Sequence, residues 1–327
     1  MDRNELCIPE SNDDLGVLVE RARTLMENAR SAATRSGYAR DVSDYEFFCR
    51  AHGLIALPPS APVIALYLAE LSTRMRPATI ARRMAAIADR SKRAGYGTEA
   101  LRSFAVQEVW KGIRRTLGVA PEVKSPLTAS AIREVARACP DTLIGRRDRV
   151  LALVGYAGGF RRSELAAIEL SHLKFEPDSV SIPDSVNIYV PRSKTDQESE
   201  GRTVRLPRTL AEATCPVTAI RNWVSSSGLR ESFLLRSIDR HGRVGGGLNP
   251  DSIARILKRA TARANLAIDV SKISSHSLRS GLVTEASQQG MSPLAVMEVT
   301  GHRTVAIVKR YFRGQLAGGP SAAGAGL

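Results

Sequence analysis

A stretch without hydrophobic periodicity divides this chain in two. It runs from residue 118 to 127, contains one glycine and two prolines, and predicts an extended linker between two domains. The chain's 327 residues are too many for one small core, which agrees with that division. We therefore expect domains at 13–117 and 128–313, a disordered leader at 1–12 and a flexible Gly/Ala-rich tail at 314–327.

The first domain has the pattern of a small helical bundle. Apolar residues recur at three- and four-residue steps, and Gly53 and Gly95 stand where helices should end. The predicted helices begin at Asp13, before Tyr38, at Pro62, at Pro77 and at Ser103. Four or five helices of this length can enclose one core.

One predicted helix of this domain, between Pro77 and Gly95, has a face on which nearly all the charged residues are basic. Asp89 is its single acidic residue, and its basic residues are Arg82, Arg83, Arg90, Lys92 and Arg93. Most surface helices expose a solvated charged face, which is the simpler interpretation. A face of one sign favours contact with phosphates, so we predict that these five residues bind DNA.

In the second domain, the spacing of the apolar residues changes after His172. Helical patterns precede that residue and resume at Pro216, while three short runs of β-type residues lie between them. Those runs, Leu173–Phe175, Asn187–Val190 and Thr203–Leu206, predict a small antiparallel sheet, and the glycine-rich residues 241–247 predict a loop. The fold class is therefore mainly α with a small antiparallel β-sheet.

The net charge of +14 favours a polyanionic partner, and nucleic acid is the leading candidate. No apolar run reaches the ~18 residues of a spanning helix, and the acidic start of the chain resembles no targeting peptide. The four cysteines fit neither a disulfide framework nor metal-ligand spacing. We expect a cytoplasmic, bacterial, nucleoid-associated protein with no cofactor and no metal.

The segment from Ser275 to Tyr311 concentrates groups that suit a phosphate. His276 and Arg279 lie one helical turn apart, Gly301 and His302 follow an apolar run, and Tyr311 closes the next amphipathic segment. An arginine offers a planar fork of donors, while histidine and tyrosine can exchange protons. Each residue alone would more often be an ordinary surface or core residue.

With the upstream residues added, the chain resembles the tyrosine recombinases, or phage-type integrases, of the two-domain Cre and Xer kind. Phe160-Arg161-Arg162-Ser163-Glu164-Leu165 is similar to the family's first arginine box, and Lys194 stands where the family keeps a lysine in a hairpin. His276-Ser277-Leu278-Arg279, Gly301-His302 and Tyr311 follow in the family's order and spacing. No single motif is specific, but all six positions in order are.

The resemblance implies a SAM-like amino-terminal core-binding domain, an α+β catalytic domain and a chemistry. Tyr311 would be the nucleophile that forms a 3′-phosphotyrosyl intermediate, as in integration or resolution of mobile-element or replicon DNA. Glu164 would be the structural acid near the site, and the catalytic residues would be Arg161, Lys194, His276, Arg279, His302 and Tyr311. The partners implied are double-stranded DNA with paired half-sites and a homotetramer that joins two sites.

Three alternatives stay open at this point. Lys174 is a rival to Lys194, because the hairpin around Lys194 is long and acidic at Glu198 and Glu200. A type IB topoisomerase-like relaxing enzyme would use similar chemistry, and a catalytically silent DNA-binding protein could keep the same fold. In the family, a further helix after the tyrosine often docks onto a neighbouring protomer. In this chain a Gly/Ala-rich tail follows Tyr311 instead, so the mode of assembly also stays open.

Overall fold

The computed structural model describes residues 13–119, 124–177, 184–191 and 201–302, together with 304, 305 and 308. Within this part of the chain, helices predominate and the strands form small antiparallel sheets, which confirms the predicted fold class. The chain forms two compact units, Met1–Glu122 and Val123–Leu327, which divide within the predicted linker. Lys194, Tyr311, the leader at 1–12 and the tail at 314–327 lie outside the described residues.

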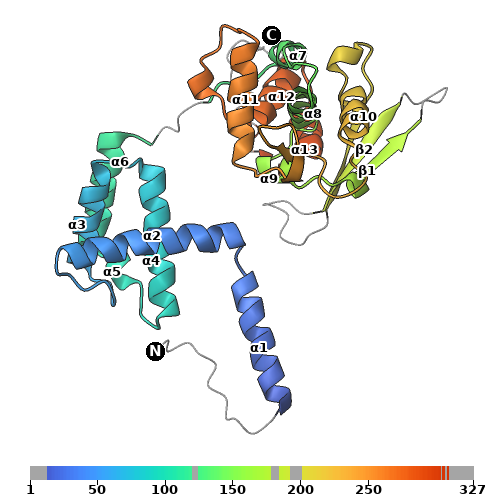
Figure 1. Cartoon of the computed structure of the whole chain (residues 1–327). Helices are drawn as coiled ribbons and strands as arrows, with labels where there is room; N and C mark the ends of the chain where they lie inside the picture. Colours follow the sequence, from blue (N-terminus) through green and yellow to red (C-terminus); the bar gives the residue numbers. More distant parts are fainter. Residues whose placement is uncertain are drawn as a thin grey trace, which may run out of the picture. The chain divides into compact units, whose positions relative to one another are not determined.

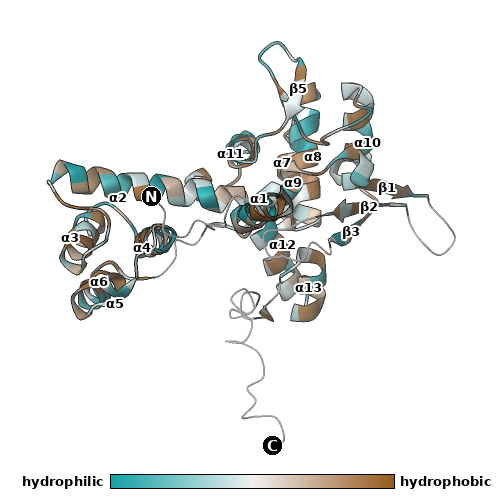
Figure 2. Ribbon diagram, turned by 90° about the horizontal axis from the view of Figure 1, so that it is seen from below, coloured by the Kyte–Doolittle hydropathy of each residue, from teal (hydrophilic) through white to brown (hydrophobic). Residues whose placement is uncertain are grey.

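The amino-terminal unit is a helical bundle. Its helices are α1 (Asp13–Asn28), α2 (Ala32–Ala51), α3 (Ala61–Ser72), α4 (Pro77–Arg93), α5 (Glu99–Arg102) and α6 (Phe104–Leu117). Prolines in the first turns of α3 and α4, and the Ser31 and Ser103 side chains before α2 and α6, fix where these helices begin. In Figure 2, hydrophilic and hydrophobic residues alternate along α2, as expected of a helix with one buried face. Its buried side chains pack with those of α3, α4 and α6 in one core.

The carboxy-terminal unit is built around α8 (Leu143–Ala157), which is buried on nearly every side from Val150 to Gly155. Figure 1 shows the helices gathered about it, and α7, α10, α11 and α12 all contact it. The other helices are α7 (Ala129–Arg137), α9 (Arg162–Ala166), α10 (Pro216–Ser227), α11 (Ser252–Arg263), α12 (His276–Gln288) and α13 (Pro293–Thr300). A Cβ at Gly155 would lie 2.6 Å from a Leu278 methyl carbon, so glycine there lets α8 and α12 pack closely.

The predicted sheet is present, with β2 in the centre. Strands β1 (Leu173–Glu176), β2 (Ser185–Val190) and β3 (Arg202–Pro207) are antiparallel, and Ile188 is paired with both Leu173 and Val204. Val186, Ile188 and Val190 alternate with more exposed residues along β2, so one face of the sheet joins the core.

The prediction of a loop at 241–247 was wrong in part. Strand β5 (Val244–Gly247) pairs with β4 (Arg236–Ile238) as a short hairpin. Three consecutive glycines have a low strand propensity, which hides this strand in the sequence. The turn is held by the Asp239 carboxylate, which accepts hydrogen bonds from the backbone N–H groups of His241 and Arg243. Across the described ranges, no helix is both long and apolar enough to cross a membrane.

Candidate active site

Arg279 is a deeply buried residue of the site, with 2% of its surface exposed. It lies in the first turn of α12, and its Nη1 donates to the carbonyl of Gly159 at 2.7 Å and to the carbonyl of Thr300. Gly159 has a φ of +54°, a left-handed conformation that glycine adopts without strain. The turn at Gly158-Gly159 therefore aims a carbonyl at this guanidinium. Arg279 thus joins the turn after α8 to the end of α13.

His302 stands one residue beyond the left-handed cap of α13, Gly301, whose φ is +66°. The Thr300 hydroxyl donates to the Val296 carbonyl at 2.6 Å, so it accepts at 2.7 Å from Nδ1 of His302. Nε2 of His302 then accepts from Nε of Arg279 at 3.3 Å. These bonds favour one neutral tautomer, with the proton on Nδ1. Burial, Arg279 and Arg161 lower the pKa of His302 to about 4.

Arg161 precedes α9, and its side chain lies between a carboxylate and a carbonyl. Nη1 donates to Oε1 of Glu164, and Nη2 donates to the carbonyl of Gly301 at 3.1 Å. Oε2 of Glu164 also accepts from the backbone N–H of Arg161 at 3.0 Å, which caps α9. Burial would raise the pKa of Glu164, but the hydrogen bonds and positive charge of Arg161 hold it below its usual range. Glu164 therefore stays ionised and orients Arg161.

His276 is the first residue of α12, on the same turn as Arg279. The residue is exposed to solvent. Its pKa is nevertheless lowered, because the surrounding protein partly desolvates it and because Arg279 and Arg161 are positively charged. A neutral imidazole beside two guanidinium groups is suited to accept a proton near a bound anion.

The structure therefore brings together five residues singled out in the sequence: Arg161, Glu164, His276, Arg279 and His302. The side chain of Lys174, the alternative to Lys194, lies on β1, where it is 78% exposed and pairs with Glu176. Arg162 points away and pairs with Asp251 on the surface. In the ranges that the structure describes, no three His, Cys, Asp or Glu residues are grouped to hold a metal ion.

Arg202 is a site residue that the sequence analysis missed. Its Nη2 donates to Oε2 of Glu164 at 3.0 Å, and its Nη1 donates to the carbonyl of Val299. A signal was available, because Arg202 alternates in phase with Val204 and Leu206, the buried residues of β3. An arginine on the inward face of a strand needs a partner, and here that partner is Glu164.

The five predicted DNA-contacting residues of α4 occupy different surroundings. Arg83 is 8% exposed and pairs with Asp44 of α2, while its Nη1 donates to the Tyr67 hydroxyl at 2.6 Å. Arg82 makes a bidentate pair with Asp41, with distances of 2.8 and 2.9 Å. These contacts favour a role for Arg83 in joining α2, α3 and α4 rather than in binding phosphate.

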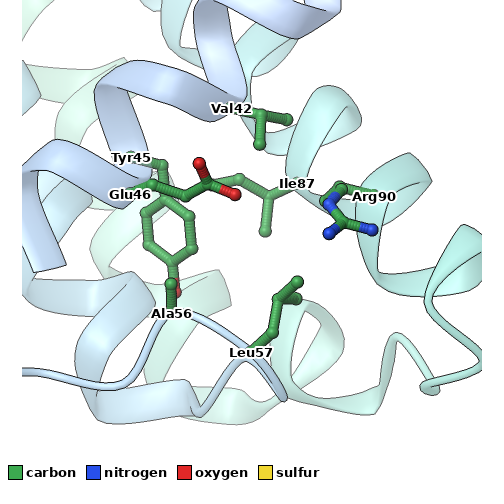
Figure 3. Close-up of a pocket in the computed structure, with 7 residues that line it drawn as sticks. All are labelled: Val42, Tyr45, Glu46, Ala56, Leu57, Ile87 and Arg90. Atoms are coloured by element: carbon green, nitrogen blue, oxygen red, sulfur yellow. The ribbon is translucent and has the colours of Figure 1, made fainter. Parts of the chain in front are cut away.

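Arg90 and Arg93 line an open groove of about 370 Å³ between α2 and α4, and Lys92 is exposed on the same helix. Arg30 and Arg35 also line this groove, and its single carboxylate, that of Asp89, pairs with Arg30 and Arg93. Figure 3 shows Arg90 facing Val42 and Glu46 of α2 across a neighbouring shallow pocket. Arginine residues therefore outnumber acidic residues in the lining of this groove, which gives it a net positive charge.

Comparison with known proteins agrees with this geometry. The model of the phage integrase family matches residues 126–316, which is more than half of the chain. The "Integrase/recombinase xerD homolog" of Selenomonas ruminantium is 30% identical over 307 residues, covering 93% of this chain and 87% of that protein. The tyrosine recombinase XerC of Myxococcus xanthus is 26% identical and covers 91% of this chain and 93% of its own.

Among solved structures, a lambda integrase tetramer bound to a Holliday junction has the same fold. Its TM-score is 0.57 at 16% sequence identity, and the match covers 96% of this chain and 80% of that one. At this identity the likeness concerns the fold.

Proposed function

Because the chain belongs to the phage integrase family of tyrosine recombinases, we propose that it cuts and rejoins DNA at specific sites. The observation that carries the proposal is the cluster of Arg161, Arg279, His276 and His302 around one small region. Two guanidinium groups and two neutral imidazoles form a site for one phosphodiester.

The proposed reaction is a transesterification in which Tyr311 attacks the scissile phosphorus. A bond forms between the phenol oxygen and phosphorus, the bond to the 5′ oxygen of the next nucleotide breaks, and a 3′-phosphotyrosine results. The hydroxyl of another strand later attacks the same phosphorus and releases the tyrosine. One phosphoester bond replaces another at each step, so the reaction needs no external energy source.

The roles of the other residues follow from where charge develops. A phenol has an ordinary pKa near ~10, so a base must remove its proton, and neutral His276 is suited to do so. Arg161 and Arg279 stabilise the negative charge on the non-bridging oxygens, with His302 beside them. We assign to Lys194 the protonation of the departing 5′ oxygen.

We further propose that two DNA sites, each with paired half-sites, are joined by four copies of this protein. The tetrameric state of the lambda integrase complex supports this assembly. In a DNA-binding protein with a net charge of +14, the arginine-lined groove of the amino-terminal unit would contact the backbone. We place the protein in the bacterial cytoplasm, on the nucleoid.

The test is covalent capture of DNA. A binding site is first selected from a pool of random duplexes, and a labelled duplex with that site and a nick beside the cut is then incubated with the protein. The short released strand diffuses away, so the covalent complex accumulates on a denaturing gel. Tyr311→Phe should bind the duplex and form no complex, while Tyr96→Phe, an exposed tyrosine of the other unit, should form it normally.

Complex formation by Tyr311→Phe would refute the nucleophile. Wild-type protein that binds but never forms the complex would indicate a silent DNA-binding protein. Covalent capture with relaxation of supercoiled plasmids, and no recombinant product between two sites, would indicate a topoisomerase-like enzyme.

A further inference from the structure

Arg202 is a partly buried arginine that donates hydrogen bonds to a carboxylate and to a backbone carbonyl. Its side chain is 16% exposed at the start of β3. It donates to Glu164 and to the carbonyl of Val299, and its guanidinium carbon lies 5.6 Å from the ring centroid of Phe160. Desolvating a guanidinium is costly, and these partners offset part of that cost.

One end of Arg202 is joined to the residue that orients Arg161. Oε2 of Glu164 accepts from Nη2 of Arg202 and from the backbone N–H of Arg161, both at 3.0 Å. The carboxylate therefore lies between two arginines and is itself 1% exposed. If Arg202 is removed, Glu164 loses one of the donors that fix its position, and the Arg161 side chain loses a fixed partner.

The other end of Arg202 holds the turn that carries His302. Nη1 donates to Val299 in the last turn of α13, where helix carbonyls lack partners within the helix. Gly301 lies against the same side chain: a Cβ there would be 2.9 Å from Nε of Arg202. The absence of a side chain at Gly301 lets the guanidinium approach the turn between Thr300 and His302.

We propose that Arg202 is a positioning residue for strand cleavage, because it holds the Arg161 and His302 sides of the site at a fixed separation. This inference rests on the proposed function. The planar fork of arginine is required, because one group must reach a carboxylate on α9 and a carbonyl on α13. The ammonium of a lysine is a point donor on a flexible stem and cannot span both acceptors with the same geometry.

The experiment measures the single-turnover rate of covalent complex formation on the nicked duplex described above, at saturating protein, beside the dissociation constant for that duplex. Arg202→Met should slow the rate by about 100-fold, the loss typical of a reacting group misplaced by about 1 Å. Affinity should stay within about threefold, because the Arg202 guanidinium is bound to Glu164 and to the Val299 carbonyl within the protein. The control is Arg205→Met on the same strand, whose exposed side chain donates to Ser185 and should leave the rate unchanged.

Arg202→Lys keeps a positive charge beside Glu164 and decides the case if Arg202→Met fails to fold. Its rate should fall at least about tenfold while its melting temperature and DNA affinity stay close to wild type. A purely structural role would lower the melting temperature and the fraction of active protein but leave the rate of the folded fraction intact. A wild-type rate in folded Arg202→Lys would overturn the inference. Loss of the complex in wild-type protein would instead overturn the proposed function.

Discussion

Replacing Glu164 by glutamine should destabilise the carboxy-terminal unit far more than the loss of an ordinary ion pair. The Glu164 carboxylate is 1% exposed and faces the guanidinium groups of Arg161 and Arg202. Removing its charge leaves two partly buried cations beside each other. Breaking a buried pair in this way costs about 3–5 kcal/mol, and the 16–19% exposure of the arginines places the expected loss near 3 kcal/mol. For a unit of this size, that loss lowers the melting temperature by about 6–12 °C.

The chain contains a probe for this measurement. Trp223 is fully buried in the carboxy-terminal unit, and its indole N–H donates to the Leu234 carbonyl at 2.7 Å. In a Trp110→Phe background its fluorescence reports urea unfolding of that unit alone. The matched control is Glu176→Gln, which removes the partner of exposed Lys174 and should cost at most about 1 kcal/mol. If Glu164→Gln costs no more than Glu176→Gln, then Glu164 does not compensate the two arginines as argued.

Two other outcomes follow from charges in the two units. The pKa of His302 is about 4 in the folded protein and about 6.5 in an unfolded chain, so the unfolded state binds more protons between these values. The contribution of neutral His302 to the free energy of unfolding is therefore complete above about pH 6.5 and is lost as the pH drops towards 4. Urea titrations at pH 5 should show that His302→Asn loses about 1 kcal/mol less stability than the wild type on going from pH 7 to pH 5. In the amino-terminal unit, Arg83→Met should cost about 3 kcal/mol, because Asp41 and Asp44 lose a buried partner, whereas Arg82→Met should cost about 1 kcal/mol. Hydrogen exchange of amides in α2 and α4 measures this difference.

Local signals in the sequence predicted most of the helices and the three-stranded sheet. The prolines that begin α3, α4 and α13 and the glycine that ends α13 are short-range devices, readable without knowing the fold. The alternating apolar residues of β2 and β3 are equally local. The short helix α5 and the hairpin of β4 and β5 were missed, because four helical residues or a run of glycines carry too little periodicity.

What the sequence could not show is which charges neutralise each other. Arg83 and Arg93 are both arginines on α4, yet Arg83 is buried and pairs with an aspartate 39 residues away. Arg202 lies 38 residues from Glu164, so its role depends on how the sheet meets α9. Periodicity places a residue on a face, but only the packing of several elements decides what that face meets.

Backbone carbonyls help the protein to hold four cationic or potentially cationic side chains close together in this site. Arg279 and Arg161 each direct N–H groups at backbone carbonyls, those of Gly159, Thr300 and Gly301, which are fixed by two left-handed glycines. These carbonyls accept hydrogen bonds without neutralising the guanidinium groups, and the single carboxylate of Glu164 is shared by Arg161 and Arg202, so a net positive charge remains to attract an anion. A guanidinium has five N–H groups, so bonds to the protein can set its orientation and still leave donors for a phosphate.

His302 also takes part in this hydrogen-bond network. In the structure its Nε2 accepts from Arg279, so it offers no proton to a bound group in this state. A phosphate beside Arg279 would draw the Nε proton of that arginine towards its own oxygens and would favour a proton on Nε2 of His302 through its negative charge. The arrival of the substrate anion would thereby convert His302 from an acceptor for Arg279 into a donor to the phosphate. The low pKa keeps His302 neutral in the structure, so that it does not add to the repulsion among Arg161, Arg279 and Arg202.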